Sequence, residues 1–140
     1  MILPKIKLHY DHEKLRKICV KNQIELLVIH GSQAAGRATA ESDIDVGLLM
    51  KKCNQKKYFK VIGELAIVFG EKCDPVFLNA AESMIAYQVA LNGVPLYEAK
   101  RGLFDAFMTT SISRYQDARK FRQLEKEYLQ EKVKRWNSPE

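Results

Sequence analysis

The chain has 140 residues, 46% hydrophobic and 29% charged, a composition typical of one globular domain with its own core. No apolar run approaches the roughly 18 residues of a membrane span, and residues 1–7 are too short and interrupted for a signal peptide. The three cysteines lack metal-type spacing, which favours reduced thiols and a cytoplasmic protein. The formal net charge is +6, and a basic surface attracts anions.

A helix followed by a buried strand is expected at the start of the chain. Apolar side chains recur at helical spacing over residues 11–22, at Leu15, Ile18 and Cys19. The next run, residues 24–30, is short, apolar and β-branched, as a buried strand is.

A turn suited to phosphate should follow this strand. Gly31 lets the backbone turn sharply and approach a ligand closely. Ser32 is placed to cap a short helical stretch, so that its hydroxyl and the first free amides point the same way. Amides arranged in this way bind phosphate.

Two aspartates lie in the second predicted strand, residues 43–49. Because alternate side chains of a strand share a face, Asp43 and Asp45 should point the same way. Two carboxylates so close repel each other unless a cation or hydrogen bonds keep both ionised. Mg²⁺ prefers one or two carboxylates together with substrate phosphates, so the sequence predicts a site for a magnesium nucleotide.

Three more helices and a third strand complete the expected elements. Helices should cover about residues 56–69, 80–92 and 103–136, and a strand residues 73–78. The stripe expected to pack from the first of these helices is Phe59, Ile62, Leu65, Ala66 and Phe69. The residues of the last helix expected against the body are Phe104, Phe107, Met108, Tyr115, Ala118 and Phe121. The class is therefore α/β: a small mixed sheet carrying the aspartates, helices on one side and a long C-terminal helix.

Basic side chains gather in two places. Five lysines and no acid lie within residues 51–60, and the last helix is also rich in lysine and arginine. Such surfaces attract triphosphate, nucleic acid or acidic protein. A solvated face or a protein-docking surface ranks above direct nucleic-acid binding, because no nucleic-acid motif accompanies the lysines.

The turn and the strand after it carry a combined motif. Its residues are Gly31-Ser32, Ala34, Gly36, Ala38 and Ser42-Asp43-Ile44-Asp45-Val46. This motif resembles the minimal nucleotidyltransferases (MNT), the smallest members of the DNA polymerase β-like nucleotidyltransferase superfamily. The resemblance implies a polymerase β palm-like fold. It also implies a nucleotidyltransferase domain over 1–102 and a helical extension of the same single domain over 103–140.

The resemblance implies roles for particular residues. Asp43, Asp45 and a third carboxylate, for which Asp74 fits, would hold two Mg²⁺ ions, and Asp74 is also the candidate for accepting the proton. The implied nucleotide-binding residues are Gly31, Ser32, Arg37 and Ser42. Many relatives carry basic residues where this chain has Gln33 and Ala35. Arg37 is therefore the nearby candidate for contacting the triphosphate.

Minimal nucleotidyltransferases pair with HEPN proteins in toxin–antitoxin modules. The resemblance thus implies an antitoxin that transfers AMP from ATP to a tyrosine of a HEPN ribonuclease toxin, in a hetero-oligomer and without a membrane partner. Two alternatives stay open. The chain could neutralise a toxin by occlusion without catalysis, which the residues at Gln33 and Ala35 favour, or transfer a nucleotide to a small hydroxylated molecule.

Overall fold

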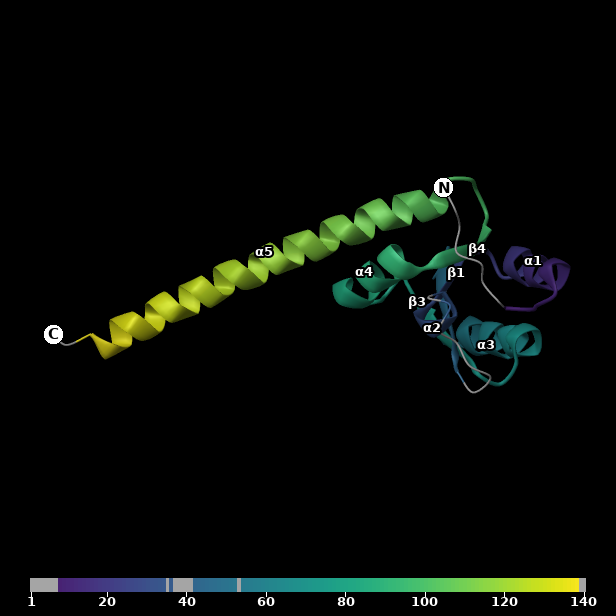
Figure 1. The fold of residues 1–140 in the computed structure, drawn as a ribbon, viewed down its shortest axis with the longest axis horizontal. Helices are drawn as coiled ribbons and strands as arrows, with labels where there is room; N and C mark the ends of the chain where they lie inside the picture. The colour runs from purple at the N-terminus through teal and green to yellow at the C-terminus, as the bar shows by residue number, and fades with distance from the viewer. Residues whose placement is uncertain (1–7, 35, 37–41, 53, 139–140) are drawn as a thin grey trace.

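The computed structural model describes residues 8–34, 36, 42–52 and 54–138. Helices and strands alternate along the chain (Figure 1). In chain order they are α1 His12–Lys21, β1 Ile24–His30, α2 Gly31–Ala34, β2 Ile44–Met50, α3 Gln55–Phe69, β3 Cys73–Phe77, α4 Ser83–Asn92, β4 Val94–Glu98 and α5 Leu103–Asn137. The expected α/β class is confirmed, and β1 has the predicted bounds.

The described strands form one mixed sheet in the order β3-β2-β1-β4. Strand β1 pairs antiparallel with both β2 and β4, whereas β2 and β3 run parallel. Strand β4 was not among the predicted strands. It contains Pro95, which cannot donate to a ladder and is tolerated because β4 lies at the edge of the sheet.

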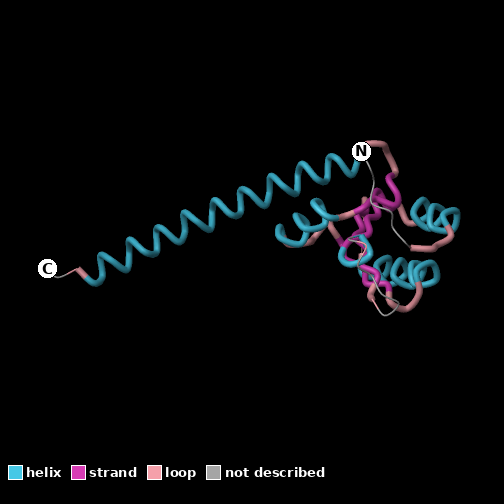
Figure 2. The backbone as a smooth tube through the Cα atoms, in the orientation of Figure 1, coloured by secondary structure: helices cyan, strands magenta, loops and turns pink. Residues whose placement is uncertain are grey.

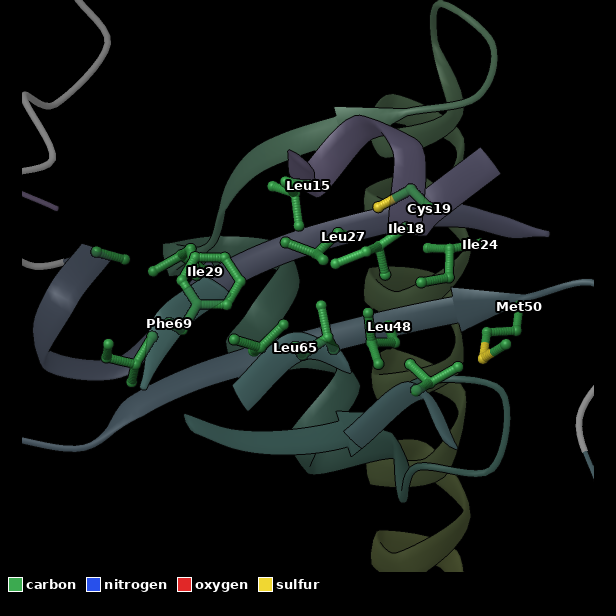
Figure 3. Close-up of a cluster of buried hydrophobic side chains, with 14 residues drawn as sticks. Leu15, Ile18, Cys19, Ile24, Leu27, Ile29, Leu48, Met50, Leu65 and Phe69 are labelled. Atoms are coloured by element: carbon green, nitrogen blue, oxygen red, sulfur yellow. The ribbon is translucent and has the colours of Figure 1, made fainter. Parts of the chain in front are cut away.

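Hydrophobic side chains fill both faces of the sheet. Leu27 and Ile29 of β1 pack with α1 and α3 in a first cluster, shown in Figure 3. Leu26 and Val28, which point the other way, pack with side chains of α4 and the start of α5. A strand that is apolar at both parities is buried on both faces. Helices therefore lie on both sides of the sheet, where the sequence pattern led us to expect one.

The buried faces of two helices differ from expectation. In α3 the buried residues are Val61, Leu65 and Phe69, while Phe59, expected in the core, is 63% exposed. In α5, Phe121 was expected against the body and is 68% exposed. Both helices carry apolar residues around much of their circumference, so spacing alone did not identify the face that packs.

A polar contact joins α1 to α3. Buried Asn22 follows the last residue of α1 and donates through Nδ2 to the Ile18 carbonyl at 2.8 Å and to Glu64 Oε2 at 2.8 Å. Lys21 Nζ lies 3.1 Å from the other oxygen of Glu64. Glu64 is thus held by two partners from the end of α1.

Helix α5 is anchored at its start and then leaves the body (Figures 1 and 2). The Glu98 carboxylate, at the end of β4, accepts a hydrogen bond of 2.8 Å from the backbone N–H of Phe104. One ring stack joins α5 to α4: Tyr115 lies 3.9 Å from Tyr87 between centroids, at 9°. Among the described helices, none combines the length and apolarity that crossing a bilayer requires.

Candidate active site

Three side chains form a line across neighbouring strands. His30, the last residue of β1, is the register partner of Asp45 in β2. Asp45 is in turn the register partner of Asp74 in β3. Asp43 lies two residues before Asp45, directly ahead of β2. The fold thus brings together the three aspartates that the sequence singled out, although Asp74 is 29 positions from Asp45.

These side chains share one face of the sheet. Ile44 and Val46, on either side of Asp45, point into the cluster beneath α1 and α3. Side chains alternate along a strand, so Asp45 points to the opposite face, on which α4 packs. The same alternation places His30 and Asp74 there. Asp45 is half-buried, whereas Asp43 and Asp74 are exposed.

The carboxylates influence one another electrostatically. Burial raises the pKa of Asp45, nearby His30 opposes the rise, and the charges of Asp74 and Asp43 add to it. Burial lowers the pKa of His30, whereas the negative charges of Asp45 and Asp74 act to raise it. Ionised Asp45 is therefore destabilised by its surroundings, and a cation would relieve the repulsion.

Gly31 places the turn after β1 against the carboxylate. Gly31 is exposed, and its φ of +69° is a left-handed conformation that favours glycine. A Cβ atom built on Gly31 would collide with the carboxylate of Asp45. The absence of a side chain lets the backbone of the predicted phosphate-binding turn approach this aspartate.

The structure describes some of the other predicted nucleotide-binding residues and not others. Helix α2 begins at Gly31, so Ser32 is its second residue, and the expectation that Ser32 caps the helix was wrong. Ser42 is half-buried and directly precedes Asp43. Arg37 and Ala35 lie outside the described residues, as do the side chains of Ser32 and Gln33.

His30, directly before Gly31, is a further neighbour of Asp45. Its Nε2 atom is buried and has no hydrogen-bond partner among the described residues. A lone histidine at a strand end carries little signal, and its importance comes from the pairing with Asp45, which no local pattern encodes.

The donor set suits a hard cation. The candidate ligands are carboxylates only, which Mg²⁺ prefers to sulfur or imidazole. Among the described residues, no group of three or more His, Cys, Asp and Glu side chains is arranged to hold a metal by itself. Mg²⁺ commonly takes one or two carboxylates and completes its shell with substrate phosphate and water.

A mixed sheet with adjacent carboxylates beside a glycine turn defines the class of a nucleotidyltransferase. Comparison of the sequence with known families bears this out. Residues 13–102 match the polymerase beta nucleotidyltransferase family, and the chain belongs to it.

Individual relatives are more distant. The protein adenylyltransferase MntA of Aphanizomenon flos-aquae (strain 2012/KM1/D3) is 27% identical over 124 residues, which span 81% of this chain and 83% of the relative. A chain of a toxin-antitoxin crystal structure with AMP-PNP has a TM-score of 0.70 at 24% identity, covering 86% of this chain and 98% of that one.

A second solved complex has the same fold. It contains tri-AMPylated Shewanella oneidensis HEPN toxin with MNT antitoxin, and the matching chain has a TM-score of 0.64 at 22% identity. The alignment covers 85% of this chain and 95% of that one. At these identities the likeness to solved structures establishes a shared fold.

Proposed function

We propose that this protein is a Mg²⁺-dependent adenylyltransferase antitoxin that transfers AMP from ATP to a tyrosine of a partner HEPN ribonuclease and so neutralises it. The observation that carries the proposal is the pairing of Asp45 with Asp74 across β2 and β3, beside the turn at Gly31. The MntA relative is named a protein adenylyltransferase, and a related fold occurs in a complex with an AMPylated HEPN toxin. A cytoplasmic location is part of the proposal, because ATP and a ribonuclease target would both be met there.

The aspartates and the turn at Gly31 would have separate roles in this reaction. Asp43 and Asp45 would hold two Mg²⁺ ions, one of them shared with Asp74. Bound Mg²⁺ would neutralise charge on the triphosphate and lower the pKa of the attacking hydroxyl. Gly31 and Ser32 would hold the triphosphate through backbone amides. Arg37 and Ser42 are further candidates for contacting the nucleotide.

The acceptor reacts from the open side of the site. The tyrosine oxygen attacks the α-phosphorus of ATP, the bond to the β-phosphate oxygen breaks, and pyrophosphate leaves in line. Asp74 accepts the hydroxyl proton. Strand β3 is an edge strand and Asp74 is exposed, so a side chain on another protein can reach it.

The test is transfer of label from α-labelled ATP with Mg²⁺ to the purified product of the adjacent reading frame, where that frame encodes a HEPN protein. Asp45→Asn is compared with Asp105→Asn, which neutralises an exposed aspartate in the first turn of α5. We expect labelled HEPN protein with the wild-type chain and with Asp105→Asn, and none with Asp45→Asn. Equal labelling by Asp45→Asn would refute the catalytic assignment.

The occlusion alternative predicts a different result. The lack of basic side chains at Gln33 and Ala35 favours it, because fewer cations then contact the triphosphate. In that case the wild-type chain and Asp45→Asn would both form a stable complex with the HEPN protein and both silence its ribonuclease activity without label. Label on a small hydroxylated compound in place of the protein would support the third alternative.

A further inference from the structure

The last part of α5 carries apolar side chains that nothing in the chain covers. We refer to residues 119–137 as the α5 tail, all of which are exposed, although the helix continues to Asn137 (Figure 1). At about 1.5 Å per residue, the tail is about 28 Å long. Its six exposed large apolar side chains, which we call the tail stripe, are Phe121, Leu124, Tyr128, Leu129, Val133 and Trp136.

The spacing of the tail stripe is the same when read from either end. The successive separations along the chain are three, four, one, four and three residues, so the midpoint lies between Tyr128 and Leu129. At about 100° per residue, all six side chains fall within about 90° of the direction in which this midpoint faces. An amphipathic helix with an uncovered apolar stripe gains stability by packing that stripe on another surface.

Two charged side chains lie in the middle of the tail stripe. Glu125 and Lys132 are equally far from the midpoint along the chain, and each lies about 10° from the centre of the stripe. In the part of the chain that the structure describes, neither forms an ion pair. Glu127, on the opposite side of the helix, accepts a hydrogen bond of 3.1 Å from Gln123. A charge covered by apolar surface is costly unless an opposite charge meets it, so the stripe requires a surface with both an acid and a base.

A second copy of the tail, running antiparallel, has this pattern. With the two midpoints level, Glu125 of each copy faces Lys132 of the other, which gives two ion pairs related by twofold symmetry. The apolar side chains of the stripe are then level in pairs: Phe121 with Trp136, Leu124 with Val133, and Tyr128 with Leu129.

A parallel pair lacks this complementarity. In register, Glu125 would face Glu125 and Lys132 would face Lys132, and like charges at facing positions of paired helices destabilise the pair. The remaining charged side chains of the tail do not oppose the antiparallel arrangement, because they lie about 70° or more from the centre of the stripe. Arg122 and Arg135 are level in the antiparallel pair but lie toward opposite edges of the stripe.

The length and area of the exposed part of α5 suit this pairing. Ser138 of one copy would lie level with Arg119 of the other, the residue at which the fully exposed part begins. Each helix would therefore end where the other leaves its body. Three aromatic side chains from each copy would be covered, and an aromatic side chain buries about 150 to 250 Å², so the area reaches the roughly 1,000 Å² of a specific interface.

We propose that the α5 tail pairs antiparallel with the tail of a second copy of this chain. The ion pairs between Glu125 and Lys132 set the register and direction, and the tail stripe supplies the apolar contact. The dimer would hold one catalytic body at each end of the paired tails, so one assembly would contain two active sites. The proposal does not rest on the proposed function, because it concerns this chain alone.

The test is association of the purified full-length chain, followed by sedimentation velocity over a range of concentrations. We expect the wild-type chain to form a dimer whose population rises with concentration. Glu125→Lys and Lys132→Glu should each raise the Kd of the dimer about tenfold or more, because like charges then face each other at both ion pairs. Since the first variant raises the net charge and the second lowers it, a loss in both cannot come from net charge.

Exchange of the two charges gives the sharper test. In Glu125→Lys with Lys132→Glu both ion pairs form again, and the Kd should return to within about threefold of wild type. An equimolar mixture of the two single variants should also associate more tightly than either variant alone. Glu127→Lys is the matched control, because it makes the same charge change on the opposite side of the tail and should leave Kd close to wild type. Circular dichroism should show the same helix content in every variant.

The outcomes decide between a second copy and another partner. A wild-type chain that stays monomeric overturns the proposal, as does a dimer whose Kd is unchanged in both single variants. Failure of the charge exchange to restore association overturns the antiparallel arrangement. A monomeric wild-type chain in which Glu125→Lys weakens binding to the product of the adjacent reading frame would assign the stripe to that partner. Loss of the proposed transfer activity would leave each of these measurements unaffected.

Discussion

His30 and Asp45 lie directly opposite each other where β1 pairs with β2. One residue further along the chain, Gly31 turns the backbone onto the carboxylate of Asp45. The antiparallel pairing therefore brings the end of one strand, with its turn, to the beginning of the next, with its aspartates. The turn at Gly31 and the aspartates near Asp43 are separated along the chain, and the pairing of β1 with β2 brings them together.

Replacing Asp45 with asparagine should abolish transfer and stabilise the fold. Burial raises the pKa of Asp45, and Asp74 and Asp43 add to the rise. The folded protein thus binds this proton more tightly than the unfolded chain, so stability falls as pH rises through the titration of Asp45. At pH 7 and without Mg²⁺, Asp45→Asn should have a higher Tm than wild type, while AMP transfer falls by about a hundredfold or more.

The control for this prediction is Asp105→Asn. Asp105 lies in the first turn of α5, where a negative charge interacts favourably with the helix dipole. Neutralising it should lower Tm slightly and leave transfer intact. A Tm for Asp45→Asn at or below that of wild type in metal-free buffer would contradict the account of Asp45 as a destabilised carboxylate.

The sequence predicted the elements whose signal is local. Strand β1 is a mainly apolar, β-branched run, and α1 buries Leu15, Ile18 and Cys19 as expected from their helical spacing. The grouping of Asp43 with Asp45 followed from their spacing in the predicted strand 43–49, although β2 begins one residue after Asp43. Asp74 was assigned by resemblance, and its register with Asp45 depends on pairing between distant segments.

The features that sequence reasoning missed depend on tertiary packing. Phe59 of α3 satisfies helical spacing as well as Val61 does, and only the position of the sheet decides that Val61 is buried. Strand β4 contains Pro95, which weakens any strand pattern. The position of His30 opposite Asp45 depends on register, which the residues on one strand do not encode.

Gly31→Ala should impair transfer more than its effect on stability explains. At a φ of +69° a side chain costs about 1 kcal/mol, and its Cβ would also collide with the Asp45 carboxylate. Gly102→Ala is the matched control, because Gly102 has a φ of +93° with open space around its Cβ position. Urea unfolding should show destabilisation in both variants, and the transfer assay should show a loss in Gly31→Ala alone. Equal activity of the two variants would argue against contact between the turn and Asp45.

Glu64 should make the protein sensitive to acid. Burial tends to raise the pKa of Glu64, but hydrogen bonds from Asn22 and Lys21 outweigh it, and the net shift is downward. A lowered folded-state pKa gives stability that is present above the ordinary value of 4.5 and is lost as pH falls through the folded-state value. Unfolding followed below pH 4.5 should therefore show a shallower loss of stability in Glu64→Gln than in wild type. Glu13→Gln, which removes an exposed pair with Arg16, should follow the wild-type curve.

The start of α5 provides a last test, because one side chain from β4 holds it. Glu98 accepts the backbone N–H of Phe104, which has no partner within the helix, and its charge suits the positive end of the helix dipole. Glu98→Ala should lower the free energy of unfolding by about 1 kcal/mol, whereas Glu98→Gln keeps an acceptor and should lose less. Urea unfolding of both variants measures this difference. An equal loss of stability in Glu98→Gln and Glu98→Ala would contradict the hydrogen bond as the cause.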